Sequence, residues 1–164
     1  MICELFIQNI AVIEKLRIDF ESGMSVLTGE TGAGKSIIID SINMILGNKA
    51  DKSLIRHGEE KALVSAVFEV SEKIQKELME YGIECEEDKL YISRGISAEG
   101  KNVCRINGVT SPLSVLREIA PTLINIHGQH DSASLFDEDN HLQFLDAFAD
   151  NDSLKEAYGI KYAA

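Results

Sequence analysis

Between residues 29 and 36 the chain reads Gly29-Glu30-Thr31-Gly32-Ala33-Gly34-Lys35-Ser36, which fits the pattern G-x-x-x-x-G-K-[ST] of a phosphate-binding loop. The three glycines allow the backbone to curl so that successive amide N–H groups point at phosphate oxygens. Lys35 is placed to reach the β- and γ-phosphates of a nucleotide, and the Ser36 hydroxyl is placed to hold Mg²⁺. The predicted nucleotide-binding residues are Gly29, Glu30, Thr31, Gly32, Ala33, Gly34, Lys35 and Ser36.

The segments on both sides of the loop provide the context that this motif requires. Residues 24–28, Met-Ser-Val-Leu-Thr, predict a short buried strand before the loop. Residues 37–46 predict a helix that stops at Gly47, a residue type favoured just after a helix end. The amino-terminal end of that helix points its positive dipole at the phosphates. Strand, loop and helix together argue against a glycine-rich turn that only resembles the motif.

Composition indicates an ordinary globular chain. Its 164 residues are 45% hydrophobic and 26% charged, enough for one domain with a real core. No apolar run approaches the roughly 18 residues that span a bilayer, and no signal-peptide pattern opens the chain. The three cysteines are odd in number and widely spaced, which favours free thiols in a reducing compartment. We therefore expect a cytoplasmic protein without membrane contacts.

The net charge of −11 bears on possible partners. Residues 131–156 contain eight acidic residues and one lysine, so this end should repel DNA at ordinary salt. If the protein acts on DNA, its basic contacts must lie on another surface or in further chain.

The remaining pattern predicts a mixed α/β core of two layers, with a mixed sheet that includes an antiparallel, strand-rich subregion. Strands are expected at 2–8, 14–20, 62–70, 89–96, 102–106 and 121–126, and helices at 71–81, 113–120 and 140–158. The first two strands are expected to form an antiparallel pair, and Asn107-Gly108 predicts a tight turn.

Two other motifs are considered and rejected. Asn48-Lys49-Ala50-Asp51 matches the N-K-x-D guanine-reading pattern, but it follows the helix at the end remote from the phosphates, and the chain contains no D-x-x-G. A polar loop is the better interpretation. His127 and His130 with Asp131 resemble metal ligands, but no further Cys or His has a compatible spacing for a four-ligand zinc site.

Part of the machinery of a phosphate-loop ATPase is absent from this sequence. Such an enzyme needs a second strand that ends in an acidic residue, often followed by a catalytic Glu. No run of four apolar residues followed by Asp-Glu occurs, and the nearest match, residues 142–146, reads as an amphipathic helix. There is also no Ser-Gly-Gly signature of the ABC type.

In these residues the chain resembles the amino-terminal part of the head domain of the RecN family of bacterial DNA repair proteins. Members of this family are SMC-like proteins with an ABC-type ATPase head. The resemblance covers nearly the whole chain. Its most specific parts are residues 29–36, 100–108 and 126–130, and residues 141–146 also look like the family.

The resemblance implies the amino-terminal lobe of a phosphate-loop NTPase head over residues 1–164, with the 140–158 helix leading toward a coiled coil beyond this sequence. It implies ATP and Mg²⁺ as cofactors, a second head as partner in a homodimer, and DNA and recombination proteins as partners through other regions. It places the protein in the bacterial cytoplasm with the nucleoid.

The same resemblance implies roles for individual residues. Lys35 and Gln129 become the catalytic residues, with Ser36 and Gln129 contacting the metal, because Gln129 resembles the Q-loop glutamine that helps bind Mg²⁺ and the attacking water. Asn9 resembles the family's opening, and Arg56 is expected either to approach the phosphates or a docked subunit or to be solvated. Alone, the chain is expected to bind ATP weakly and not to hydrolyse it.

Two alternatives stay open at this point. A self-contained small-molecule kinase would use the same loop, but the sequence shows no cluster of arginines after it to form a lid. An interaction domain whose loop stays empty is the other possibility.

Overall fold

The computed structural model describes residues 1–28, 34–124, 126, 141–142, 145–146, 148–149 and 151–162. The chain divides into two compact units, Met1–Asn125 and Ile126–Ala164. The first unit carries the sheet and the helices that surround it.

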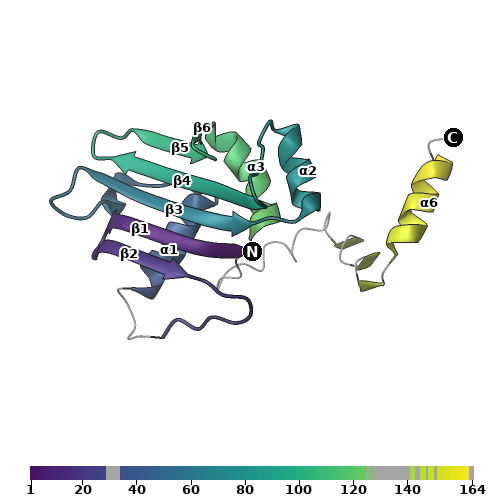
Figure 1. Ribbon diagram of the computed structural model, residues 1–164, viewed down its shortest axis with the longest axis horizontal. Coiled ribbons are helices and arrows are strands. Elements are labelled where there is room, and N and C mark those ends of the chain that lie inside the picture. The colour runs from purple at the N-terminus through teal and green to yellow at the C-terminus, as the bar shows by residue number, and fades with distance from the viewer. Residues whose placement is uncertain are drawn as a thin grey trace. The chain divides into compact units, whose positions relative to one another are not determined.

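The first unit is built on a six-stranded sheet in the order β2-β1-β3-β4-β5-β6 (Figure 1). The strands are β1 (Ile2–Ile10), β2 (Ile13–Asp19), β3 (Lys61–Glu69), β4 (Lys89–Ser97), β5 (Asn102–Ile106) and β6 (Val109–Thr110). Every neighbouring pair is antiparallel, so among the described strands the sheet is antiparallel throughout and not mixed as expected. The predicted antiparallel opening pair and the strand-rich middle are therefore confirmed, and the short β6 is an addition.

One face of this sheet forms the core. Along β3 the side chains alternate between buried and more exposed, with Ala62, Val64, Ala66 and Phe68 pointing inward. The same alternation along β1, β4 and β5 places apolar side chains in register with them across the strands. An antiparallel sheet with a single buried face produces this period of two, which is why the sequence pattern predicted these strands correctly.

Helix α1 (Lys35–Ile45) packs on that face against β1, β3 and β4. Its buried residues Ile38, Ser41, Ile42 and Ile45 recur at helical spacing and form one stripe. Ser41 donates its hydroxyl to the Ile37 carbonyl at 2.7 Å, which satisfies a polar group inside the core. The predicted helix over 37–46 is confirmed.

Helices α2 (Glu72–Glu80) and α3 (Leu113–Leu123) lie side by side near the end of β3 (Figure 1). Ser71 occupies the N-cap position of α2 without a side-chain hydrogen bond to the helix, and Gly82 follows the helix with a positive φ of 71°. A short 3-10 helix, η1 (Lys52–Leu54), lies between α1 and β3, and the Asp51 side chain caps it by accepting from Ser53 N at 2.8 Å.

Two predicted strands are wrong. Residues 24–28 form no strand, and Met24, Val26 and Leu27 are exposed. In the described part of the chain no strand pairs with this segment, and a strand without a partner leaves its backbone groups unsatisfied. An apolar run predicts burial but does not supply the neighbouring strand that burial in a sheet requires.

The expected strand over 121–126 is replaced by helix as far as Leu123. The apolar face of α3 continues across Pro121, because Leu116, Ile119, Ala120 and Leu123 are all buried on one side. Proline usually marks a helix end, so the sequence pattern ended this helix too early. Here packing of the apolar face outweighs the hydrogen bond that proline removes.

The second unit is helical where it is described. Residues 141–142, 145–146 and 148 are helical, and a separate helix α6 (Asp152–Tyr162) follows a break. The prediction of one continuous helix over 140–158 is therefore wrong. Asn151 N donates to the Asp146 carbonyl, and the Asn151 carbonyl accepts from Lys155 N. One helical segment therefore ends, and the next begins, at Asn151. Asn and Asp favour such boundaries over helix interiors.

Candidate nucleotide-binding site

The described part of the phosphate loop is its last three residues, at the start of α1. Gly34 is the N-cap residue of the helix, and Lys35 and Ser36 are its first two residues. The first backbone hydrogen bond joins Ile38 N to Gly34 O at 3.2 Å, so the helix itself supplies no acceptor for the amides of Ser36 and Ile37. Such amides, with the positive end of the helix dipole, favour an anion.

The surroundings of this helix end fit a phosphate group. No acidic residue lies in the first turn of α1, and its N-cap residue is a glycine, which has no side chain to cap the amides. A Cβ added at Gly34 would meet no atom within 4 Å among the described residues, so the backbone here faces open space. Ser36 is exposed and Lys35 is half-buried. Among the described residues, Gly34 and Ser36 at this helix end are therefore exposed.

Other predicted site residues lie outside the described part of the chain. These are Gly29, Glu30, Thr31, Gly32 and Ala33 of the loop, the glutamine Gln129, and the histidine pair His127 and His130 with Asp131. Their predicted roles stay predictions. Among the described residues, no group of three or more His, Cys, Asp or Glu side chains could hold a metal ion.

The opposite end of α1 carries interactions that the motif does not predict. Arg94 on β4 is fully buried and donates from Nη1 to the carbonyls of Met44 at 2.8 Å and Asn48 at 3.3 Å. Its Nη2 donates to Asn102 Oδ1 at 2.7 Å. Arg117 on α3 donates from Nε to the Gly47 carbonyl at 2.8 Å. Arg94 thus contacts the last turn of the helix that begins with Lys35, and both arginines contact the residues that follow its C-cap.

The sequence contains one signal for Arg94. In β4 the inward positions are Leu90, Ile92, Arg94 and Ile96, so a charged residue occupies an apolar position of the alternation. Asn48, the first residue of the N-K-x-D match, accepts from Arg94 and lies at the carboxyl-terminal end of α1, which confirms the polar-loop interpretation of residues 48–51.

Asn9 and Arg56 have structural roles in the turns next to β1. Asn9 has a positive φ of 56° and donates to Glu59 Oε2 at 3.0 Å, while its carbonyl accepts from Arg56 N at 2.9 Å. Arg56 donates from Nη1 to the carbonyls of Val12 at 2.7 Å and Ala11 at 3.4 Å. Arg56 is therefore not simply solvated: it holds the turn between β1 and β2 against the chain that leads into β3.

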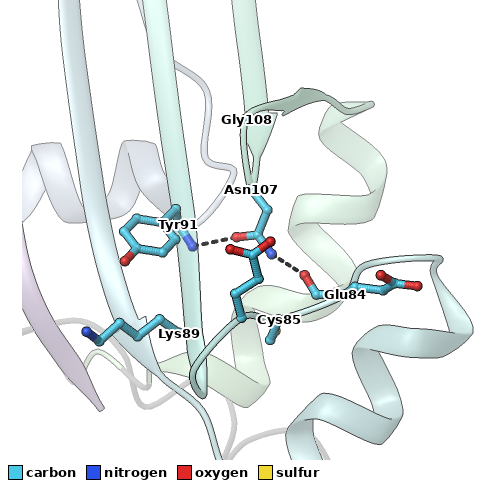
Figure 2. A pocket seen from close by; sticks show the side chains of 7 residues that line it. Glu84, Cys85, Lys89, Tyr91, Asn107 and Gly108 are labelled. Carbon is cyan, nitrogen blue, oxygen red and sulfur yellow. Dashed lines mark hydrogen bonds between the residues drawn. The ribbon is translucent and has the colours of Figure 1, made fainter.

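Residues 100–108, which resemble the RecN family in sequence, end in a turn that hydrogen bonds hold in place. Asn107 and Gly108 both have positive φ, and the Asn107 side chain accepts from Tyr91 N at 2.8 Å and donates to the Glu84 carbonyl (Figure 2). These residues line a cavity of about 260 Å³ together with Cys85, Glu86 and Lys89. Two glutamates and one lysine are among the lining residues, so the cavity is a poor phosphate site. The Asn107 side chain connects its turn to strand β4 and to the segment that carries Glu84.

Comparison with known proteins relates the chain to one domain family and to bacterial DNA repair proteins. Residues 4–159 match the family described as AAA domain. The DNA repair protein RecN of Bacillus subtilis is 46% identical over 151 residues, which are 91% of this chain and 26% of that protein. RecN of Vibrio cholerae is 38% identical over 164 residues, which are 96% of this chain and 28% of that protein. The chain thus spans about a quarter of the length of these RecN proteins.

Solved structures agree on the fold. The Smc head domain of Pyrococcus furiosus superposes with a TM-score of 0.70 at 23% identity, over 95% of this chain and 44% of that one. A structure from work on ATP-driven dimerization and DNA-stimulated activation of SMC ATPases gives a TM-score of 0.63 at 24% identity, over 83% of this chain and 90% of that one. The RecF–ATP structure gives 0.53 at 18% identity, over 68% of this chain and 27% of that one.

These likenesses confirm the predicted fold class, an SMC-like ATPase head represented by its strand-rich lobe. They give no support to a small-molecule kinase. No helix in the described part of the chain is both long and apolar enough to cross a membrane. The chain belongs to the AAA domain family, and it is similar over nearly its whole length to the bacterial DNA repair protein RecN.

Proposed function

We propose that this chain is the nucleotide-binding lobe of a RecN-like ATPase that acts in the repair of DNA double-strand breaks. The observation that carries the proposal is the start of α1. There the motif residues Gly34, Lys35 and Ser36 begin a packed helix whose first turn contains no acidic residue, and Gly34 and Ser36 are exposed among the described residues. Similarity to RecN over nine-tenths of the chain supports the assignment to DNA repair.

ATP with Mg²⁺ is the proposed ligand. The amides at the start of α1 would bind phosphate oxygens, Lys35 would place its charge against the terminal phosphates, and the exposed Ser36 hydroxyl would hold the metal ion. Gln129 is proposed to position water and metal. Mg²⁺ held there would supply positive charge against the phosphate oxygens.

The proposal assigns binding to this chain and hydrolysis to a larger assembly. The sequence contains no apolar strand ending in Asp-Glu and no Ser-Gly-Gly signature, so it lacks a general base and the group that contacts the γ-phosphate across a dimer. We propose that these groups come from further chain and from a second head. The net charge of −11 argues for DNA contacts through other regions of the protein. We propose that the protein acts in the cytoplasm with the nucleoid.

The test uses the full-length protein that contains this lobe. Lys35→Ala is expected to abolish ATP hydrolysis and survival after induced double-strand breaks, while the protein stays folded. Lys49→Ala is the matched control, because it removes the same charge from an exposed position just beyond the other end of α1. Equal effects of both substitutions, or full activity of Lys35→Ala, would contradict the proposal.

A further inference from the structure

Two guanidinium groups from different elements meet at the carboxyl-terminal end of α1. Arg94 reaches the Met44 and Asn48 carbonyls from the sheet, and Arg117 reaches the Gly47 carbonyl from α3. All three acceptors belong to the end of the helix or the two residues after its C-cap. The Met44 carbonyl belongs to the last turn of the helix, where the negative end of the helix dipole favours a cation.

Arg94 is an unusual residue for its position. Its side chain is fully buried, and its strand neighbours in register are Val64 and Cys104. No carboxylate among the described residues forms an ion pair with it, and its Nε has no hydrogen-bond partner there. Burial lowers the pKa of Arg94, and the nearby charge of Arg117 lowers it further. An apolar residue would fill this position at lower cost, so core packing alone does not account for the arginine.

The contact with Arg117 is equally specific. Gly47 has a φ of +89°, and its N–H and that of Asn48 donate to the carbonyls of Met44 and Asn43, which closes the helix end. A Cβ at Gly47 would lie 2.7 Å from Cγ of Arg117. Because Gly47 has no Cβ, Arg117 of α3 can approach the end of α1 this closely.

Fixing one end of a rigid helix fixes the other end. Helix α1 has 11 residues, a length of about 16 Å, and a tilt of about 10° at one end would move the other by about 3 Å. Phosphate binding depends on the position of groups at the opposite end, where displacements of about 1 Å matter. Arg117 also joins α1 to α3, the helix that precedes Gln129 in the sequence.

We propose that Arg94 and Arg117 are positioning residues for nucleotide binding: they clamp the carboxyl-terminal end of α1 and so hold Gly34, Lys35 and Ser36 in place for the phosphates. This inference rests on the proposed nucleotide-binding function. It adds that the affinity for nucleotide is set partly from the far end of the helix, by a sheet residue and by α3.

The test measures Mg²⁺–ATP binding and unfolding free energy on the same variants of this chain. Arg117→Met keeps the aliphatic stem and removes the guanidinium, and it should fold because the residue is exposed. After correction for the folded fraction, we expect Arg117→Met and Arg94→Met to weaken binding by about 3- to 10-fold. Arg94→Lys, which keeps the charge, should restore part of the affinity. Arg105→Met, on the exposed side of β5, is the charge-matched control and should bind normally.

A second readout separates positioning from stability. Because coupling is reciprocal, nucleotide should slow hydrogen exchange at the amides of Gly47 and Asn48 in the wild type, and much less in Arg117→Met. Unchanged affinity of the folded Arg117→Met variant would overturn the inference, even if its stability falls. Unchanged binding in Lys35→Ala would instead overturn the proposed nucleotide site itself, and the inference with it.

Discussion

Replacing Gly47 with alanine tests the closure at the end of α1 against a worked magnitude. At φ +89° an alanine is in the left-handed region, which costs about 1 to 2 kcal/mol. The new Cβ would lie 2.7 Å from Cγ of Arg117 and 3.4 Å from its Cα, so the arginine must move. Moving it lengthens the 2.8 Å hydrogen bond to the Gly47 carbonyl, whose loss costs about 1 to 2 kcal/mol. The expected total is about 2 to 4 kcal/mol.

Urea denaturation of the wild type and variants measures this cost directly. Gly100→Ala is the matched control, because Gly100 has a φ of +87° and no atom within 4 Å of an added Cβ among the described residues. It should lose only the backbone part, about 1 to 2 kcal/mol. In an Arg117→Ala background the excess cost of Gly47→Ala should disappear. Equal losses for Gly47→Ala and Gly100→Ala in the wild-type background would refute the reasoning.

Three further outcomes are expected. Ser36→Ala should remove most of the gain in ATP affinity that Mg²⁺ provides while leaving metal-free binding nearly unchanged, and a calorimetric titration with and without Mg²⁺ measures both. Asn107→Ala should destabilise the protein by about 1 to 3 kcal/mol in urea denaturation, because it removes the bonds to Tyr91 N and the Glu84 carbonyl, whereas Lys89→Ala at the same cavity should be nearly neutral. The pKa of Asp51 is lowered, chiefly by the hydrogen bond from the Ser53 backbone amide. The contribution of Asp51 to stability is therefore present above the unfolded value of 3.8 and is lost as pH falls through the lower folded value. The difference in Tm between wild type and Asp51→Asn should shrink as pH drops from about 5 to about 3.

The antiparallel strands could be predicted from the sequence because a sheet with one buried face imposes a period of two on side chains. Residues 62–70 show this alternation, and β3 is observed there. The segment 24–28 could not be placed in the same way, because its apolar character says nothing about a partner strand. The helix predicted over 113–120 is too short, because proline usually marks a helix end whereas the apolar face of α3 continues past Pro121 to Leu123.

In the candidate site, too, one part could be predicted from the sequence and another could not. The motif predicted the beginning of α1, since the residue types there are dictated by phosphate chemistry and are contiguous. The arginines at the end of α1 could not be assigned this way, because their acceptors are backbone carbonyls that any sequence supplies. Arg94 and Met44 are 50 residues apart, and only the fold brings them together. The inward register of Arg94 marks it as unusual but does not name its partner.

The most direct measurement of the central claim is a titration of this chain with labelled ATP and Mg²⁺, for the wild type and for Lys35→Ala. If the start of α1 binds the phosphates, the wild type should bind saturably with one site, and removal of Lys35 should weaken binding by about 10-fold or more, the effect of losing a charge-assisted contact. Binding of equal strength by both proteins would mean that the nucleotide is not held at residues 34–36, and the account would be wrong.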